Sequence, residues 1–231
     1  MSSQGDDRTD KGKVSVIIPT MNEEKSIGLV IGEVKRALGS RPFEILVVDT
    51  DSKDRTREVA AGTGAVVIDE PRRGYGRAYK TGFENASGDY IVTLDADMTY
   101  PASDIPALLG MLEDKALDFI TTNRFARMEK GAMGAKHRLG NWVLSATTRL
   151  LFRVKVKDSQ SGMWVFRRAI LKDLTLDSDG MALSEEIKVE AFRKSKAEEV
   201  PITYRQRVGE VKLSSWHDGF GNLRYLFKKR F

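Results

Sequence analysis

The sequence predicts an α/β fold in which a mostly parallel central sheet is covered by helices on both faces. Three observations lead to this prediction. Short runs rich in valine and isoleucine alternate with segments of helical apolar spacing, the runs are apolar throughout, and acidic residues follow several of them. With 231 residues, 41% of them hydrophobic, the chain can bury one large core, and two small domains are the alternative.

The alternation of strands and helices runs through the first half of the chain. Residues 14–18 form a β-branched run that ends at Pro19. Residues 26–38 then carry apolar side chains at helical spacing, and Gly39 ends this helix. Further strands are expected over 43–48, 65–68, 90–94 and 119–122, and further helices over 55–61, 75–85 and 105–113.

Polar side chains follow the ends of the first four expected strands. Parallel α/β sheets bind their ligands beyond the carboxyl ends of the strands. The residues at these ends are Asn22, Glu23, Asp49, Asp51, Asp69, Glu70, Asp95 and Asp97. We therefore expect the functional site at this edge of the sheet.

The sequence Asp95-Ala96-Asp97 directly follows the fourth expected strand. Side chains alternate along an extended strand, so two carboxylates separated by one residue can project to the same side. They offer hard oxygen ligands to Mg²⁺ or Mn²⁺ and leave positions for phosphate oxygens and water. Most isolated Asp-x-Asp pairs are solvated loop carboxylates, but the neighbouring acidic strand ends favour a metal site here.

The alternation ends after Arg124. The second half is expected to hold a helix over 139–152, a loop over 157–162, a strand over 163–166, a helix over 184–193, a strand over 200–204 and a basic amphipathic helix over 220–231. Both amphipathic stripes, over 139–152 and 220–231, suit packing on the core or shallow contact with an anionic membrane surface. The expected division is a disordered tail over 1–13, one domain over 14–215 and a basic amphipathic segment over 216–231.

Composition excludes several classes of function. Without cysteine there is no disulfide or thiolate chemistry, and with two histidines a zinc site is not expected. The excess of 38 basic over 33 acidic residues suits an anionic substrate or lipid surface, whereas the interleaved charges do not indicate nucleic-acid binding. No apolar run approaches the roughly 18–20 residues of a transmembrane helix, and residues 1–13 lack the apolar core of a signal peptide. We expect a cytoplasmic protein, at most peripheral on the cytoplasmic face of a membrane.

A dinucleotide-binding fold is a competing interpretation, because Gly74-Tyr75-Gly76 resembles the start of a Gly-x-Gly-x-x-Gly loop. That loop belongs between the first strand and its helix. In this chain residues 19–23 occupy that turn without a glycine, and residues 74–76 follow the third strand. Nicotinamide binding is therefore not expected.

Five segments carry a family resemblance when they are taken in order. They are Val-Ser-Val-Ile-Ile-Pro-Thr-Met-Asn-Glu over 14–23, Val-Val-Asp-Thr-Asp-Ser-Lys-Asp-Arg-Thr over 47–56, the Gly-Asp-Tyr to Asp-Ala-Asp strand over 88–97, Asp-Ser-Gln-Ser-Gly over 158–162 before Phe-Arg-Arg over 166–168, and 201–204 with 209–214. Together they resemble the inverting family 2 glycosyltransferases of GT-A fold, within them the dolichol-phosphate mannosyltransferase-like group. The resemblance covers about residues 14–215.

The resemblance implies inverting transfer from a nucleoside-diphosphate sugar to polyprenyl or dolichyl phosphate. GDP-mannose is slightly favoured as the donor, with UDP-glucose and UDP-N-acetylglucosamine close behind. The implied donor-binding residues are Pro19, Met21, Glu23, Asp49 and Asp95. The implied acceptor-phosphate residues are Arg124, Arg138, Arg207 and Lys212. The metal ligands would be Asp95 and Asp97, which with Arg124 form the implied catalytic set.

A lipid phosphate acceptor requires other side chains in the site than a hydroxyl acceptor does. The phosphate is already anionic at pH 7, so it needs cationic partners that overcome its repulsion by the donor diphosphate, and no general base. The metal then stabilises the departing nucleoside diphosphate. The chain departs from the family pattern at Thr50, Thr99 and Val211, where the pattern has Asp, Gln and Ser.

Two alternative functions remain open. The same fold could glycosylate a hydroxyl group, with Glu185 or Glu186 as general base, or it could be an idle nucleotide-sugar-binding module. The arginines favour the phosphate acceptor, and the intact Asp95 and Asp97 favour catalysis. A polyprenyl acceptor must be met at the bilayer surface, so we expect the two amphipathic helices to contact the membrane.

Overall fold

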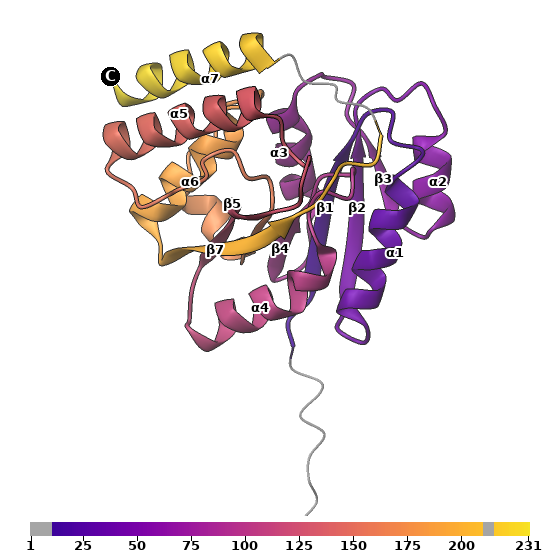
Figure 1. Ribbon diagram of the computed structural model, residues 1–231. Helices are drawn as coiled ribbons and strands as arrows, with labels where there is room; N and C mark the ends of the chain where they lie inside the picture. The colour runs from indigo at the N-terminus through magenta and orange to yellow at the C-terminus, as the bar shows by residue number, and fades with distance from the viewer. Residues whose placement is uncertain (1–10, 210–214) are drawn as a thin grey trace, which may run out of the picture.

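The computed structural model describes residues 11–209 and 215–231 (Figure 1). Its centre is a seven-stranded sheet in the order β3-β2-β1-β4-β6-β5-β7. The strands are β1 (Val14–Thr20), β2 (Phe43–Asp49), β3 (Val66–Asp69), β4 (Tyr90–Thr93), β5 (Phe119–Met128), β6 (Trp164–Arg167) and β7 (Ala197–Tyr204). The α-helices are α1 (Ile27–Leu38), α2 (Thr56–Gly62), α3 (Tyr75–Asn85), α4 (Ile105–Asp114), α5 (Ala135–Phe152), α6 (Leu183–Lys194) and α7 (Ser215–Arg230). Short 3₁₀ helices are η1 (Ala102–Asp104) and η2 (Arg168–Asp173).

The pairing of the strands confirms the mostly parallel sheet. β1 pairs in parallel with both β2 and β4, β2 pairs with β3, and β5 pairs with β7. Among the described strands, β6 is the one that runs antiparallel, between β4 and β5. The parallel strands β1, β2 and β4 therefore end at the same edge of the sheet.

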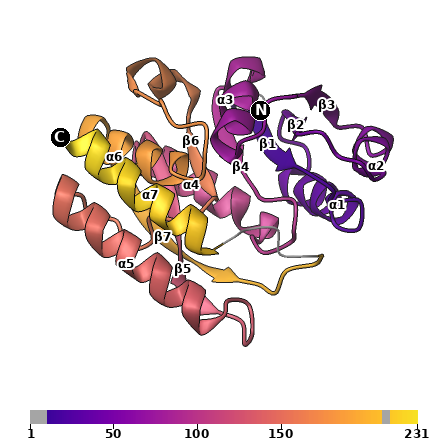
Figure 2. The same ribbon diagram turned by 90° about the horizontal axis from the view of Figure 1, so that it is seen from above.

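Helices cover both faces of the sheet, which explains why its strands are apolar throughout (Figures 1 and 2). Val16 and Ile18 of β1 belong to a core cluster with residues of α1 and α4. Ile17, which lies between them, belongs to a second cluster with residues of α3 and α6. Successive side chains of one strand thus pack into two separate cores on opposite faces of the sheet. Val47 and Val48 of β2 repeat the pattern.

α5 and α7 lie side by side as a separate layer beyond α6, as Figures 1 and 2 both show. A third, small apolar cluster lies beneath them and consists of Phe152, Val154, Val156, Val189 and Leu226. Neither helix faces the main cores of the sheet. Among the described residues, no helix combines the length and apolar character needed to cross a membrane.

Several expected boundaries differ from the structure. α5 begins at Ala135 where 139 was expected, β7 at Ala197 where 200 was expected, and α7 at Ser215 where 220 was expected. β5 extends to Met128, beyond the expected end at 122, because it resumes pairing with β7 after an irregularity between Asn123 and Arg127. Lys13, expected in the tail, donates its backbone N–H to Asp89 (2.9 Å) and its Nζ to Glu44 (2.8 Å). Residues 1–10 of the expected tail lie outside the described residues.

Candidate active site

The parallel strands bring the acidic strand ends together at one edge of the sheet. β1 pairs with β2 up to Thr20 and Asp49, and with β4 up to Thr93, so the residues that follow share this edge. Glu23, Asp49 and Asp97 are all buried there. This is the edge at which α/β sheets bind their ligands.

Asp95 and Asp97 follow β4 in different surroundings. Asp97 is 4% exposed, and its Oδ1 accepts hydrogen bonds from the backbone N–H (3.0 Å) and the hydroxyl (2.6 Å) of Thr99. Asp95 is half-buried and receives no hydrogen bond from the described residues. Burial and the neighbouring charge of Asp97 raise the pKa of Asp95 to about 7. Asp97 is therefore held by Thr99, whereas Asp95 lies beside the negative charge of Asp97 without a hydrogen-bond donor among the described residues.

A divalent cation fits this pair of carboxylates. A cation would remove the repulsion that raises the pKa of Asp95, and carboxylate oxygens are ligands that Mg²⁺ and Mn²⁺ accept. A Cβ at Gly162 would lie 2.5 Å from the Tyr75 hydroxyl and 3.2 Å from Asp95 Oδ1, so the glycine keeps the space beside Asp95 open. Among the described residues, no group of three or more His, Asp or Glu side chains could hold a metal ion. Two carboxylates would thus bind the cation together with ligand oxygens and water.

Arg207 connects the end of β1 with the Asp-x-Asp segment. Its Nη2 lies 2.9 Å from Asp97 Oδ2 and 3.9 Å from Glu23 Oε1. The backbone holds it there, because the N–H of Val208 donates to the carbonyl of Asp97 (2.9 Å). The Nε of Arg207 is buried and has no hydrogen-bond partner in the described part of the chain. This nitrogen is a donor that a ligand oxygen can use.

The predicted donor-binding residues at the end of β1 lie at the same edge. Pro19 is half-buried in β1 and Met21 half-buried in the turn that follows. The backbone N–H of Glu23 donates to Thr56 Oγ1 (2.7 Å), and its Oε2 accepts from Ser26 Oγ (3.0 Å). These bonds fix the turn after β1. The nucleotide contacts of these residues stay a prediction.

Asp49 is fully buried at the end of β2 and already saturated by protein donors. Its carboxylate accepts from the Thr20 hydroxyl (2.9 Å), from the N–H (3.1 Å) and hydroxyl of Ser52, and from Arg57 Nε (2.6 Å). A carboxylate has about four acceptor positions, so all of them are occupied. A contact from Asp49 to a base or ribose would have to displace one of these bonds. Arg57 also pairs with Asp69 at the end of β3.

Arg124 lies at the irregularity between β5 and β7 and forms a buried pair with Asp158. Its Nε and Nη2 each lie 2.8 Å from an oxygen of that carboxylate, and its N–H donates to the same group (3.0 Å). Burial opposes both charges, but Asp158 raises the pKa of Arg124 above its ordinary value, and Arg124 lowers the pKa of Asp158. The guanidinium also lies over the Tyr204 ring, 5.4 Å from its centroid. Nη1 is the nitrogen that remains for a ligand.

The role of Asp158 was missed in the sequence analysis, as was that of Lys188. Asp158 opens the 158–162 motif, but its partner lies 34 residues away, and no spacing rule connects them. Lys188 is fully buried in α6, where Nζ donates to the carbonyls of Ser159 and Ser161 (both 2.7 Å). Burial lowers the pKa of Lys188 to about 7. A lysine within the apolar face of the expected helix was the available signal.

A cavity of about 800 Å³ opens beside these groups. One part of its lining is charged or polar and comes from the sheet edge: Asp97, Thr99, Arg124 and Arg207. Another part is apolar and comes from α5 and α7: Leu139, Val143, Leu144, Phe220 and Leu223. One continuous cavity thus joins two of the predicted catalytic residues, Asp97 and Arg124, to the amphipathic helices, whereas Asp95 is not part of its lining.

The predicted phosphate-binding residues do not all reach this cavity. Arg124 and Arg207 line it. Arg138 is exposed on α5 and is not part of the lining, whereas its neighbours Lys136 and His137 are. Lys212 lies outside the described residues.

Glu185 and Glu186, the candidates for a general base, are buried in the first turn of α6, and neither lines the cavity. Glu185 Oε1 accepts a hydrogen bond from Gln160 Nε2 (2.6 Å), while its Oε2 is buried without a partner in the described part of the chain. Burial raises the pKa of Glu185 to about 8. Gln160 is the residue of this group that lines the cavity.

Gly74 and Gly76 are explained by packing of α3. A Cβ at Gly74 would collide with the carbonyl of Asp179, and a Cβ at Gly76 would lie 2.5 Å from the carbonyl of Ser178. Both glycines therefore allow the start of α3 to approach the loop before α6.

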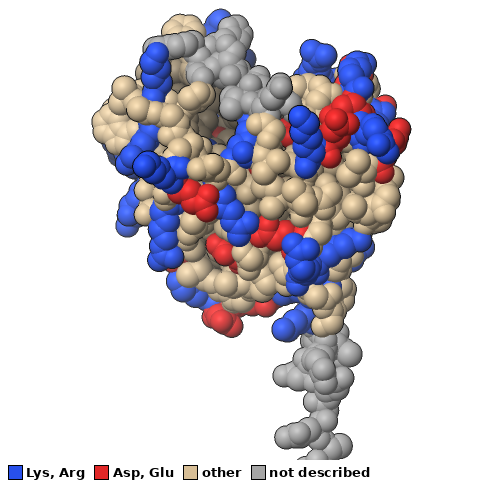
Figure 3. Space-filling model, turned by 45° about the vertical axis from the view of Figure 1, so that its right-hand side comes forward, with Lys and Arg blue, Asp and Glu red and all other residues tan. Residues whose placement is uncertain are grey.

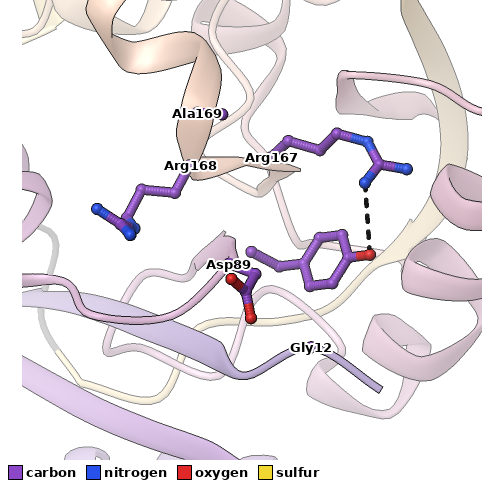
Figure 4. A pocket seen from close by; sticks show the side chains of 6 residues that line it. Gly12, Asp89, Arg167, Arg168 and Ala169 are labelled. Atoms are coloured by element: carbon purple, nitrogen blue, oxygen red, sulfur yellow. Dashed lines mark hydrogen bonds between the residues drawn. The ribbon is translucent and has the colours of Figure 1, made fainter. Parts of the chain in front are cut away.

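A second hollow, of about 520 Å³, lies at the opposite edge of the sheet (Figure 4). Its lining consists of Gly12, Asp89, Tyr90, Arg167, Arg168 and Ala169. Arg167 donates from Nε to the Leu117 carbonyl (3.0 Å) and from Nη1 to the Tyr90 hydroxyl (3.5 Å). Arg168 Nε donates to the Gly88 carbonyl (2.6 Å). Because these groups bind the protein itself and lie at the amino ends of β1 and β4, the hollow is not the candidate site.

Comparison with known sequences gives consistent matches. Residues 15–175 match the family model described as Glycosyl transferase family 2. The low-salt glycan biosynthesis hexosyltransferase Agl6 of Haloferax volcanii is 38% identical over 218 residues, which cover 92% of this chain and 52% of that protein. A dolichyl-phosphate hexose transferase of the same organism is 34% identical, with 89% of each chain covered. A dolichol-phosphate mannosyltransferase of Pyrococcus furiosus is 31% identical, over 94% of this chain and 63% of that protein. The chain thus spans about half the length of Agl6 and most of the hexose transferase.

Solved structures share the fold. Glucosyl-3-phosphoglycerate synthase from Mycobacterium tuberculosis, in complex with Mn²⁺, UDP-glucose and phosphoglyceric acid, superposes with a TM-score of 0.78 at 21% identity. The match covers 94% of this chain and 79% of that one. The same enzyme with Mg²⁺ and UDP gives a TM-score of 0.77 at 20% identity. At this level of identity the likeness concerns the fold alone.

Proposed function

The chain belongs to glycosyl transferase family 2 and has the GT-A fold, and from this premise we propose that it transfers a hexose, with inversion, from a nucleoside-diphosphate sugar to a polyprenyl phosphate of dolichyl type. The names of the Haloferax and Pyrococcus relatives support the acceptor class. The arrangement of the chain's own residues supports the activity as well.

One observation carries the proposal. The cavity of about 800 Å³ has a charged part beside Asp97, Arg124 and Arg207 and an apolar part between α5 and α7. A polyprenyl phosphate has the same division, because an anionic phosphate is joined to a long apolar chain. A small hydrophilic acceptor would leave the apolar walls in contact with water.

The chemistry requires few groups. An oxygen of the acceptor phosphate attacks the anomeric carbon of the donor and forms a new C–O bond. The bond from that carbon to the diphosphate oxygen breaks, and the nucleoside diphosphate leaves with the electron pair. Arg124 and Arg207 would hold the phosphate and offset its repulsion by the donor. A divalent cation bound at Asp95 and Asp97 would supply counter-charge for the leaving group.

The position of the two glutamates supports a phosphate acceptor over a hydroxyl. A general base must come within hydrogen-bond reach of the proton that it removes. Glu185 and Glu186 are buried outside the cavity lining, and Glu185 binds Gln160. A phosphate monoester is largely dianionic at pH 7, since its second pKa is about 6, and needs no base.

For the donor we propose a nucleoside-diphosphate hexose, with GDP-mannose first. The mannosyltransferase name of the Pyrococcus relative supports mannose, whereas the solved structures of shared fold contain UDP or UDP-glucose with Mn²⁺ or Mg²⁺. UDP-glucose therefore ranks close behind, followed by UDP-N-acetylglucosamine. The metal would be Mg²⁺ or Mn²⁺.

We also propose that the protein meets its acceptor at a membrane surface. Large apolar side chains are exposed on α5 and α7: Leu139, Trp142, Val143, Leu150, Phe220 and Phe227. On the face that Figure 3 shows, lysine and arginine side chains alternate with acidic and neutral ones. α5 has no acidic residue and α7 ends in Lys228, Lys229 and Arg230, so attraction to anionic lipid is expected to add to the apolar contact.

The test incubates the protein with Mn²⁺, polyprenyl phosphate and one radiolabelled nucleotide sugar at a time. The expected result is label that moves into organic solvent with the lipid for one donor, with GDP-mannose the first candidate. A reaction without lipid and one with Asp97→Asn are the controls. Label that never enters the lipid phase with any donor would contradict the proposed function.

A further inference from the structure

α7 packs along α5, and its described side chains form hydrogen bonds to α6 and to the 158–162 loop. Among its side chains that the structure describes, Leu226 and Asn222 are buried, whereas Phe220 and Phe227 are exposed. Leu226 belongs to the small third cluster rather than to either main core. Leu223 and Tyr225 are half-buried, so beside its packing on α5 this helix of 16 residues buries only a modest apolar area among its described side chains.

Two polar side chains of α7, Tyr225 and Lys229, bind Glu186 of α6, and Lys229 Nζ also donates to the carbonyl of Thr175 (3.2 Å). This carboxylate is 1% exposed, and its Oε1 accepts a hydrogen bond from Lys229 Nζ (2.7 Å) and another from the Tyr225 hydroxyl. Its Oε2 accepts from the N–H of Ser178 (2.9 Å), which fixes the carboxylate from the other side. A buried carboxylate with these partners holds them strongly, because each lost contact would leave charge unsolvated. Lys229 is also 3.6 Å from Glu190.

The opposite end of the described α7 forms part of the cavity. Gly219, Phe220, Asn222 and Leu223 line it. Asn222 Nδ2 donates to Gln160 Oε1 (3.1 Å), and Gln160 lies in the 158–162 loop and lines the same cavity. One end of α7 therefore binds Glu186, and the other end forms part of the cavity wall.

We propose that Glu186 is a positioning residue that seats α7 as a wall of the acceptor cavity. This inference rests on the proposed function only in naming the occupant, a prenyl phosphate whose apolar chain contacts Phe220 and Leu223. The seat explains why a carboxylate is buried in the first turn of α6 without reaching the cavity. Acceptor affinity then depends on Glu186 through the position of α7, while the donor site at the ends of β1 and β4 does not.

The first experiment measures whether Glu186 seats the helix. Hydrogen exchange, in the absence of lipid, follows the α7 amides in the wild type, Glu186→Gln, Lys229→Met and Lys228→Met. An unseated helix of this length is marginal in water, so exchange should accelerate about tenfold or more in Glu186→Gln and Lys229→Met. Lys228→Met removes the same charge from the same turn, but Lys228 is exposed, so its exchange should match the wild type. Equal exchange in all four proteins would overturn the proposal.

The second experiment measures transfer to farnesyl phosphate in solution with the same variants. The acceptor KM should rise about tenfold in Glu186→Gln and Lys229→Met, with kcat and the affinity for nucleotide and Mn²⁺ near wild-type values. Faster exchange with an unchanged acceptor KM would show that α7 is seated by Glu186 but is no wall of the acceptor site, and would overturn the proposal. If the wild type transfers sugar to no prenyl phosphate, the proposed function fails, whereas the exchange comparison still decides whether Glu186 seats α7.

Discussion

The buried pair of Arg124 and Asp158 connects the proposed acceptor site with the stability of the fold. Asp158 is fully buried, so Arg124→Ala would leave its charge uncompensated at a cost of about 3–5 kcal/mol. Arg124→Lys is the sharper probe, because lysine keeps the charge and loses the two-point contact. We predict that it raises the acceptor KM about tenfold and leaves nucleotide affinity unchanged. Steady-state kinetics with a prenyl phosphate and calorimetry with the nucleoside diphosphate measure the two effects.

Arg138→Ala is the matched comparison for Arg124→Lys. Arg138 is exposed outside the cavity lining, so its loss should change the acceptor KM by no more than about twofold. The family resemblance, in contrast, implies a phosphate contact at this position. An effect of Arg138→Ala as large as that of Arg124→Lys would place the phosphate farther along α5.

Asp97→Asn tests the metal assignment. Asparagine can still accept the hydrogen bonds from Thr99, but it removes the negative charge that the cation and Arg207 require. We predict a loss of transfer of about 100-fold or more, with a thermal unfolding curve close to wild type. Chelation by EDTA should mimic the variant, and added Mn²⁺ should restore only the wild type. Transfer that persists in EDTA would rule out the metal site.

Glu44 gives a prediction of pH dependence. Partial burial raises its pKa, but hydrogen bonds from Lys13, Ser15 and Ser87 outweigh this effect and hold the pKa at about 2, below the ordinary value of 4.5. The ionised carboxylate therefore stabilises the fold fully above the ordinary pKa and loses this effect as the pH falls toward 2. Glu44→Gln should lower the free energy of unfolding by about 1–3 kcal/mol at pH 7. In urea titrations the difference in unfolding free energy between the wild type and Glu44→Gln should be smaller at pH 3 than at pH 7. The control Glu58→Gln, at an exposed position, should change the unfolding free energy by no more than about 0.5 kcal/mol at either pH.

Single residues also show what the sequence could and could not reveal. Asp95 and Asp97 were predictable, because their spacing at a strand end is a local pattern that the structure places at the expected edge. The family resemblance named Arg124 as a candidate, but its bond to Asp158 was not predictable, since it joins segments far apart in the chain. The saturation of Asp49 by Thr20, Ser52 and Arg57 likewise depends on the folded structure.

At the scale of elements, the apolar stripe of α5 faces outward. Leu150 is 80% exposed, and Trp142 is 57% exposed. Sequence periodicity left two alternatives for this stripe, core packing or membrane contact, because both fates require the same spacing. The buried positions of α5 are Leu144, Ser145, Thr148 and Phe152, so Leu150 does not pack on the core, which agrees with the proposed membrane contact.

Leu150→Asp tests this surface. We predict that it reduces binding to anionic vesicles about tenfold in a sedimentation assay, because a charge cannot enter the apolar part of the bilayer. The matched control is Leu29→Asp, an exposed leucine on α1, 54% accessible and on another part of the molecule. Both variants should unfold within about 0.5 kcal/mol of the wild type. Equal vesicle binding by wild type and Leu150→Asp would argue against membrane contact through α5.

The strands and helices of the first half were largely predictable from periodicity. β1, β2 and β4 are apolar on both faces, because α1 and α4 cover one side and α3 and α6 the other. The full length of β5 was not predictable, because its second part pairs with β7 past an irregularity and carries exposed side chains. The antiparallel direction of β6 likewise follows from tertiary pairing rather than from its own sequence.

At the scale of the whole molecule, the sheet edge and the α5–α7 layer meet in one cavity. The edge contributes charge through Asp97, Arg124 and Arg207, and the two helices contribute apolar walls. Neither part alone indicates the acceptor, since a charged strand edge suits many phosphate ligands and an apolar groove suits many lipids. Their junction in one space is what favours a lipid phosphate.

The most direct test of this account compares two acceptors that differ only in the phosphate. With Mn²⁺ and one nucleotide sugar, transfer is measured to a polyprenyl phosphate and to the matching polyprenol. We predict that kcat/KM is about 100-fold or more higher for the phosphate, because Arg124 and Arg207 have no partner on the alcohol and the two candidate bases, Glu185 and Glu186, lie outside the cavity lining. Equal or faster transfer to the polyprenol would contradict the account.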